Sequence, residues 1–326
     1  MEITKVELTE CSELINRCRA ELSKRVVGQK EVADGIITAL IAGGHVLLEG
    51  VPGLAKTLAV KTFAEISGLE FKRIQFTPDL LPADLTGTLI YEQAHGNFSV
   101  HKGPVFANLV LADEINRAPA KVQSALLEAM AEQQVTIGET TYQLPKPFFV
   151  LATQNPIEQD GTYSLPEAEL DRFLLKVEAF YPTPEEEIAI LKMNGKADSI
   201  PVNRVFSVEA LQKCRRCVES ITADEKILGY IVSIINATRP DESSSHHGDI
   251  QHYISFGASP RAGIALLKCA KVMALFSGRS YVLPEDVQDV AKQVLRHRLV
   301  LNYEAAADSI TPDDLIEKII NLMPVP

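Results

Sequence analysis

The sequence predicts an α/β domain built on a parallel sheet, followed by a smaller all-α domain. Two observations predict this fold class. In the first half of the chain, short apolar runs alternate with stretches of helical periodicity, which is the pattern of a parallel α/β sheet. Beyond about residue 184, only helical periodicity is found. The predicted domains are therefore 1–182 and 183–326, joined at the proline-containing segment "YPTPEE".

Length and composition are those of a globular protein with room for about two packed domains. No apolar run approaches the roughly 18 residues that a membrane span requires. The N-terminal segment is too acidic and too interrupted for a secretory signal, which favours a cytoplasmic protein. The net charge of -11 argues against a general affinity for nucleic acid, although it leaves room for a locally basic pore or groove.

The first predicted elements surround a glycine-rich loop. A short amphipathic segment is followed by a predicted helix over 31–42, which ends at two glycines. The apolar run "HVLLEG" (45–50) leads directly into the loop, and residues 57–67 have helical spacing up to Gly68. Strand, loop and helix thus occur in the order that a phosphate-binding loop requires.

Two further apolar runs, 108–114 and 148–155, are short enough and suitably flanked to be buried parallel strands. The stretch between them predicts a helix with one apolar face. Asn108 is a polar residue in the first of these runs and is interpreted as a strand-edge position. Residues 88–103 and 135–144 predict hairpins instead, because alternating residues flank Gly-containing turns.

The second domain shows five helical segments, and a polar stretch interrupts them at 241–251. This stretch predicts a solvated loop. His246 and His247 within it are adjacent rather than spaced to bind a metal from one helix face, which argues against a metal site. The predicted helices lie near 208–220, 223–238, 260–276, 284–300 and 312–323.

The five cysteines are an odd number in a large chain, which favours reduced thiols over a disulfide framework. Cys214 and Cys217 are the one close pair. Because no second pair and no histidine stand at metal-ligand spacing, this pair is interpreted as a helix feature rather than a zinc or redox site.

The segment "GVPGLAKTL" (50–58) departs by one residue from the usual phosphate-binding loop, which has a glycine before its lysine. Here that residue is Ala55. Backbone N–H groups of such a loop surround nucleotide phosphates, Lys56 would reach the β- and γ-phosphates, and Thr57 would hold Mg²⁺. Since alanine is small and tolerates a helical φ, the substitution is costly only where a positive φ or a very close approach is needed.

An acidic pair, Asp113 and Glu114, ends the run 108–114. Ligands of open α/β sheets bind at the carboxyl ends of the strands. Asp113 is therefore expected to orient Mg²⁺, and Glu114 to act as the base that polarises the attacking water. Acidic residues are also common where a helix starts, but the distance of this pair from Lys56 favours the functional interpretation.

Three more side chains are candidates for the reaction. Asn155 would hold the attacking water or the γ-phosphate, although an asparagine before a proline is also typical of a turn. Arg172 or Arg261 opposite a transferring phosphoryl group would contribute on the order of 10³ to 10⁵ in rate. Each arginine taken singly is more commonly a surface ion-pair partner.

Together these residues resemble the AAA+ ATPases, and specifically their MoxR branch. The resemblance covers almost the whole chain and rests on five segments in order: "GVPGLAKT", "LADEINRAP", "ATQNP", "LPEAELDRF" and "GASPRA". It implies an AAA+ P-loop domain with a parallel five-stranded sheet, followed by an all-α helical lid. It also implies that an Ala-Lys-Thr ending is common in this branch, and that the 241–251 loop is longer than usual.

The resemblance assigns roles to the candidate residues. Asp113 and Glu114 match Walker B, Asn155 matches sensor 1, and Arg261 matches the sensor 2 arginine, which also contacts the nucleotide. Arg172 resembles the arginine finger that enters a neighbouring subunit's site. The residues implied to bind ATP or ADP are Val27 and Gly28 against the adenine and the Walker A loop, which comprises Gly50, Val51, Pro52, Gly53, Leu54, Ala55, Lys56, Thr57 and Leu58.

The family implies an ATPase that assembles into a homo-oligomeric ring, usually hexameric, with the two hairpins as insertions that often face the pore. The expected function is chaperone-like remodelling or maturation of a client, often by metal or cofactor insertion, with a separate von Willebrand factor A domain protein as adaptor. A nucleotide-gated regulatory or scaffold ring is an alternative that the same residues serve. A DNA translocase is a third, which the acidic charge disfavours.

Overall fold

The computed structural model describes residues 4–51, 53–93, 96–156, 161–240 and 248–326. The contacts divide the chain into two units. Residues 17–173 and 177–208 form the α/β unit, whereas the segment up to Asn16, residues 174–176 and the chain from Glu209 onward form the helical unit. This division falls later than the predicted boundary at 182/183, because residues 183–208 make their contacts within the α/β unit. The limits of separately folding domains stay a prediction.

A five-stranded parallel sheet is the centre of the α/β unit, as predicted. Its strand order is β2-β5-β8-β1-β9, so the chain crosses over between non-adjacent strands. The pairs β2·β5, β5·β8 and β8·β1 are parallel. The strands are β1 (Val46–Glu49), β2 (Phe71–Gln75), β5 (Leu109–Asp113), β8 (Phe149–Gln154) and β9 (Leu175–Glu178).

The edge strand β2 was not located by its sequence pattern. Four of its five side chains are exposed or half-buried, and only Ile74 is buried, so it lacks the continuous apolar run of β5 and β8.

The polar residue before β5 has a structural explanation. Asn108 accepts a hydrogen bond from the Glu70 N–H and donates one to the Pro147 carbonyl, which ties together the starts of three neighbouring strands rather than marking a sheet edge.

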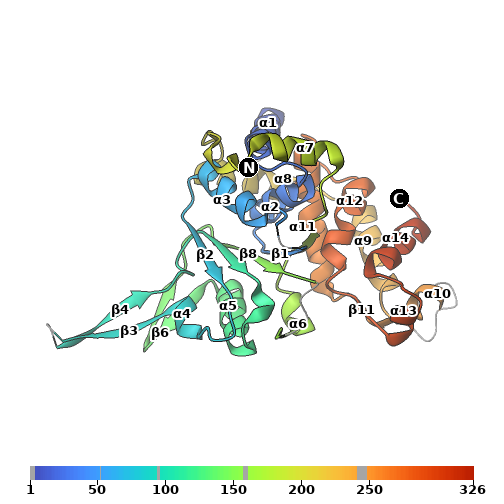
Figure 1. Cartoon of the computed structure of the whole chain (residues 1–326). Coiled ribbons are helices and arrows are strands. Elements are labelled where there is room, and N and C mark those ends of the chain that lie inside the picture. Colours follow the sequence, from blue (N-terminus) through green and yellow to red (C-terminus); the bar gives the residue numbers. More distant parts are fainter. Residues whose placement is uncertain (1–3, 52, 94–95, 157–160, 241–247) are drawn as a thin grey trace. The chain divides into compact units, whose positions relative to one another are not determined.

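Helices cover both faces of the sheet, with α2 and α3 on one face and α5 on the other (Figure 1). Alternate strand residues such as Val110 and Val150 pack in one buried cluster with Leu126 and Met130 of α5. The regular elements of the unit other than sheet and hairpin strands are α2 (Lys30–Ala42), α3 (Lys56–Ser67), α4 (Pro82–Thr86), η1 (Ile115–Arg117), α5 (Ala120–Glu132), α6 (Glu167–Leu170), α7 (Pro184–Met193) and η2 (Ala197–Ser199).

Two antiparallel strand pairs extend from the α/β unit. The first pairs β3 (Gly87–Glu92) with β4 (Asn97–Lys102), and the second pairs β6 (Gln134–Ile137) with β7 (Thr140–Gln143). Figure 1 shows the first as a long arm that projects well beyond the sheet. These are the segments in which hairpins were expected.

The helical unit contains short strands that the sequence pattern did not indicate. The expectation of purely helical structure is corrected by the antiparallel pair of β10 and β11, and the helix predicted over 284–300 ends at Leu295. His246 and His247 lie outside the described residues. The elements from the N-terminal helix onward are α1 (Lys5–Ser23, shared between the units), α8 (Val208–Ser220), α9 (Glu225–Ala237), α10 (Gly248–Gln251), β10 (Ile254–Phe256), α11 (Pro260–Phe276), α12 (Pro284–Leu295), β11 (Val300–Leu301), α13 (Tyr303–Ala307) and α14 (Pro312–Leu322).

All five cysteines are buried and unbridged. Cys214 and Cys217 lie on α8, and the Sγ of Cys217 is 3.5 Å from the Sγ of Cys11 on α1. Hydrogen bonding with Cys214 and burial raise the pKa of Cys11 to about 12, and burial alone raises the pKa of Cys269 to about 12. Cys11 and Cys269 are therefore protonated at neutral pH and behave as packing residues. Among the described residues, no helix is both long and apolar enough to cross a membrane.

A buried histidine joins β1 to its neighbours. Nδ1 of His45 accepts a hydrogen bond from the Val150 N–H at 3.0 Å, and Nε2 lies 3.4 Å from the Met130 carbonyl. A ring nitrogen that accepts from an N–H group carries no proton, so the imidazole is neutral and protonated at Nε2. Burial lowers the pKa of His45 from 6.5 to about 4, against a smaller opposing effect of the Met130 carbonyl.

The fold should therefore lose stability as the pH falls from about 6.5 to about 4. In this window the unfolded chain protonates His45 and the folded chain does not. The contribution of the neutral imidazole to the free energy of unfolding is therefore complete above the unfolded-state pKa of 6.5, and it is lost as the pH falls to the folded-state pKa of about 4. The full loss is about 3 kcal/mol. Urea unfolding at several pH values checks this: His45→Asn should show a smaller decrease than wild type, and an equal decrease would contradict the assignment.

Candidate active site

The glycine-rich loop has a left-handed residue where the alanine stands. Ala55 precedes α3 with φ 54° and ψ 21°, so this position has the positive φ at which an alanine is costly. A non-glycine residue in this region costs about 1–2 kcal/mol. Gly53 also has a positive φ of 87°, while a Cβ at Gly50 would come within 2.9 Å of the Ala179 Cβ. The loop thus uses one glycine for its backbone angle and another for close packing.

Lys56 is held inside this loop. Its Nζ donates a hydrogen bond to the Gly50 carbonyl at 2.6 Å. Burial lowers the pKa of Lys56, and the nearby carboxylates of Asp113, Glu114 and Glu49 oppose that shift. A partly desolvated ammonium gains from a strong anionic partner, which a nucleotide phosphate would supply.

A cavity of about 630 Å³ lies above the loop, and the predicted residues meet there. Five segments that are distant in sequence contribute: the loop with α3, the carboxyl end of β2, the carboxyl end of β5, the residue after β8, and residues 195–198 around the start of η2. The predicted residues that line it are Gly53, Ala55, Lys56, Thr57, Leu58, Asp113, Glu114 and Asn155. Basic, acidic and amide groups therefore converge on one polar pocket at the carboxyl edge of the sheet.

An apolar cavity of about 430 Å³ shares part of this lining, including Gly53, Ala55 and Leu58. Val27 lines it together with Leu54 of the loop, and contact of Val27 with an adenine stays a prediction. Gly28 lines a different cavity; its φ is 74°, and a Cβ there would meet the Glu186 carboxylate. Further lining residues that the sequence did not single out are Tyr181, Pro182, Ile190, Leu191 and Met193. A polar pocket beside an apolar one suits a molecule with a phosphate end and a flat apolar end.

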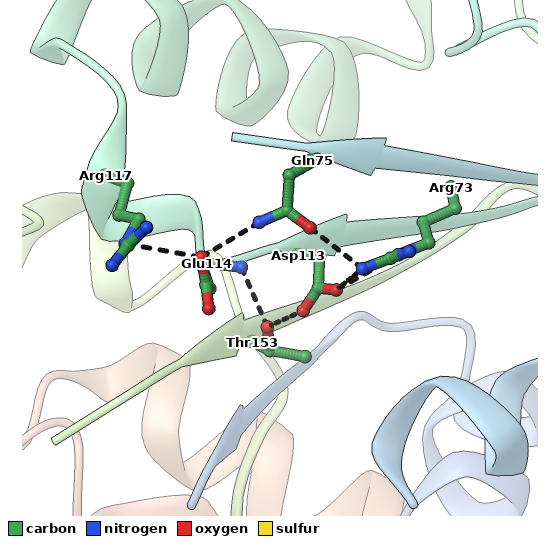
Figure 2. Close-up of polar contacts among 6 residues, drawn as sticks. All are labelled: Arg73, Gln75, Asp113, Glu114, Arg117 and Thr153. Atoms are coloured by element: carbon green, nitrogen blue, oxygen red, sulfur yellow. Dashed lines mark hydrogen bonds and ion pairs between the residues drawn. The ribbon is translucent and has the colours of Figure 1, made fainter. Parts of the chain in front are cut away.

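The metal-site candidate Asp113 is fixed by two partners (Figure 2). Its Oδ1 accepts a hydrogen bond from the Thr153 hydroxyl at 2.7 Å. Its Oδ2 accepts from Arg73, with Nη2 at 2.6 Å and Nε at 3.1 Å. A hard cation such as Mg²⁺ prefers oxygen ligands, and Asp113 with the Thr57 hydroxyl in the same pocket provides them. The residues present therefore fit a magnesium–nucleotide complex.

Glu114 occupies the left-handed region, with φ 56° and ψ 54°, and leaves the strand at a sharp turn. Its Oε2 accepts a hydrogen bond from Gln75 Nε2 at 2.9 Å and lies 3.3 Å from Nε of Arg117. Its N–H donates to the Thr153 hydroxyl at 2.9 Å. Figure 2 shows the Gln75, Arg73 and Arg117 side chains reaching the acidic pair from β2 and from the turn after β5.

Several predicted residues lie elsewhere. Among the described residues, Arg172 does not line the 630 Å³ cavity of its own chain; its Nη1 donates to the Leu127 carbonyl at 2.8 Å. Arg261 is in the first turn of α11, in the helical unit, and its sensor role stays a prediction. Val51 is half-buried in the loop, and Pro52 lies outside the described residues.

Sequence reasoning missed Arg73, Gln75 and Thr153. The first two lie on the edge strand that had no clear pattern. Thr153 did carry a signal, because it is a hydroxyl residue in the otherwise apolar run before Gln154 and is almost fully buried. A buried hydroxyl at the end of a strand needs partners, and here these are the two acidic residues.

Comparisons with known proteins agree with this geometry. Residues 45–175 match the model of the ATPase family associated with various cellular activities (AAA), and residues 248–319 match the AAA lid domain. The chain is 46% identical over 96% of its length to Chaperone MoxR1 of Mycobacterium tuberculosis, of which it covers 82%. It is 30% identical over 98% of its length to Protein MoxR of Methylorubrum extorquens, of which it covers 97%. The chain belongs to the MoxR family of AAA+ ATPases.

A solved structure supports the same fold for this MoxR-family chain. A crystal structure from Cytophaga hutchinsonii is similar at a TM-score of 0.90 and 47% identity, covering 98% of this chain and 97% of that one. The AAA family model begins at His45 and ends at Leu175, so it includes the Walker A loop, the acidic pair, Asn155 and Arg172. Nucleotide binding is the family property that this segment carries.

Substitutions in the Walker A loop should separate backbone strain from phosphate contact. Ala55→Gly should keep ATP binding, because glycine adopts the observed φ without strain, whereas Ala55→Val should weaken binding and lower the free energy of unfolding. Lys56→Ala should abolish binding. Titration with a fluorescent ATP analogue and thermal unfolding measure both effects.

Lys121→Ala, which removes an exposed lysine of α5, is the charge-matched control and should bind like wild type. Retention of binding by Lys56→Ala together with its loss in Ala55→Gly would refute this account of the loop.

Proposed function

We propose that this chain binds ATP and hydrolyses it in a ring of identical subunits, to drive chaperone-like remodelling or maturation of a client protein. The single observation that carries the proposal is the convergence of Lys56, Thr57, Asp113, Glu114 and Asn155 on one cavity beside an apolar one. The identity to Chaperone MoxR1 supports the chaperone-like output.

The residues divide the work of binding and hydrolysis. The apolar cavity accepts the base, while the loop N–H groups and Lys56 bind the phosphates. Mg²⁺, held by Thr57 and Asp113, would neutralise charge on the phosphates when it is bound with ATP. Glu114 would take the proton of the attacking water, and Asn155 would orient that water without adding negative charge.

Arg172 would complete the site of a neighbouring subunit. In its own chain it is anchored to the carbonyl of Leu127 at α5 rather than placed in the cavity. An arginine that stabilises charge on the transferring phosphoryl group from outside is worth roughly 10³ to 10⁵ in rate. Arg261 on α11 would act as the second sensor from the helical unit. A hexamer is the ring size we propose.

The client and an adaptor would be separate proteins. We propose an adaptor with a von Willebrand factor A domain and a client that receives a metal or cofactor. The long arm of β3 and β4 is the segment best placed to transmit motion, because it projects from the unit that holds the nucleotide site (Figure 1).

Glu114→Gln should bind ATP normally and hydrolyse it about 10² to 10⁴ times more slowly, since the amide keeps the shape of the side chain but cannot accept the proton. Steady-state phosphate release and ATP titration measure the two properties. Glu132→Gln, an exposed change on α5, is the matched control and should keep full activity. Equal turnover in Glu114→Gln and wild type would remove Glu114 as the base.

Mixing two inactive variants tests the shared site. Arg172→Ala should lose hydrolysis but keep binding, and a mixture with Glu114→Gln should regain activity. In the mixed ring, Arg172 of the Glu114→Gln subunit would complete the intact acidic pair of its neighbour. Arg17→Ala, at an exposed arginine of α1, is the control that should stay active alone. Full activity of Arg172→Ala, or no recovery on mixing, would contradict a site shared between subunits.

A further inference from the structure

The Thr153 side chain contacts both members of the acidic pair. It lies near the carboxyl end of β8, directly beside β5, since the register places Ala112 opposite Ala152. Its side chain is almost completely buried. Its hydroxyl is 2.7 Å from Oδ1 of Asp113 and 2.9 Å from the backbone nitrogen of Glu114 (Figure 2).

The direction of both hydrogen bonds is determined by chemistry. The Glu114 N–H can only donate, so the Thr153 oxygen accepts there. The single hydroxyl proton is then given to the Asp113 carboxylate, which as an ionised group is the stronger acceptor. One hydroxyl therefore orients the carboxylate of Asp113 and fixes the backbone of Glu114, a residue in the left-handed region.

The two partners of Asp113, Arg73 and Thr153, differ in whether they compete with a cation for its carboxylate. Arg73 carries a positive charge, its side chain is 49% exposed, and it occupies Oδ2. A cation that approaches Asp113 competes with this guanidinium, and a long exposed side chain is free to withdraw. Thr153 is neutral, buried and bound to Oδ1, so it can remain in place while Oδ2 faces the metal.

We propose that Thr153 is a positioning residue for the metal site, which acts through Asp113 on the binding of magnesium with the nucleotide. This role rests on the proposed nucleotide site. Removal of an outer partner of a metal ligand typically costs 10- to 100-fold in metal affinity. The expected signature is a loss of the Mg²⁺-dependent part of ATP affinity, with the Mg²⁺-independent part unchanged.

The experiment measures the Kd of a fluorescent ATP analogue with Mg²⁺ and with a chelator, and divides the Kd with chelator by the Kd with Mg²⁺. Thr153→Val, which has the same shape without the hydroxyl, should decrease this ratio about tenfold. Thr153→Ser, which restores the hydroxyl, should return it to near the wild-type value. Thermal unfolding shows whether valine disturbs the fold. If it does, Thr153→Ala provides the same test with a smaller side chain.

Thr62→Val is the matched control. Thr62 is a fully buried threonine of α3 whose hydroxyl has no hydrogen-bond partner among the described residues, so its removal should leave the ratio unchanged. A double-mutant cycle with Asp113→Asn then tests the route of the effect. If Thr153 acts through Asp113, Thr153→Val should cause no further decrease in the Asp113→Asn background.

An unchanged ratio in Thr153→Val and Thr153→Ala would overturn the proposal, as would an equal loss of affinity with and without Mg²⁺. A full additional loss in the Asp113→Asn background would also overturn it. These outcomes all require a wild-type protein that binds the nucleotide. If wild type bound none, the nucleotide site itself would be refuted, and the role of Thr153 with it.

Discussion

The parallel register of β1, β8 and β5 is the constraint on which the site depends. Parallel strands end at the same edge of a sheet, and the pairings Glu49 with Gln154 and Ala112 with Ala152 align three carboxyl ends. The glycine-rich loop leaves β1, the acidic pair ends β5, and Asn155 follows β8, so groups that are about 100 residues apart in sequence meet without any further folding device. A slip of one residue in β8 would turn the Thr153 side chain to the opposite face of the sheet and remove both of its contacts.

Two residues with a strained backbone lie at this same edge. Ala55 and Glu114 both occupy the left-handed region, and neither is a glycine. Each such residue costs on the order of 1–2 kcal/mol, which must be offset by its surroundings. At Glu114, the hydrogen bond to Thr153 and the buried side chain of Ile115 hold the turn. At Ala55, the helix that follows supplies the restraint, since Ala59 donates to the Ala55 carbonyl. Both strained residues adjoin the groups that bind and hydrolyse the nucleotide in the proposed function.

The sequence predicted much of the fold and several of the residues that line the 630 Å³ cavity. Long apolar runs located β1, β5 and β8, because strands buried on both faces contain few polar residues. The edge strand β2 is mostly exposed, so its pattern was too weak to read, and Arg73 and Gln75 were missed with it. The conformation of Ala55 could not be inferred either, because alanine normally avoids a positive φ and only the tertiary structure imposes it. The short pair β10 and β11 is likewise too brief to produce a periodic signal.

Charge balance around the acidic pair explains how two adjacent carboxylates coexist in the site. Arg73 contacts Asp113 and Arg117 contacts Glu114, so each carboxylate has its own cation. Lys56 is turned instead toward the carbonyl of Gly50, where burial lowers its pKa. In the proposed function, a magnesium–triphosphate complex would supply another cation for Asp113 and anions for Lys56. Arg73 and Lys56 would then exchange partners rather than gain new ones, and the cost of desolvating their charges would be shared between the two arrangements. If the proposed function holds, the site would therefore favour the nucleotide and the metal together more than either one alone.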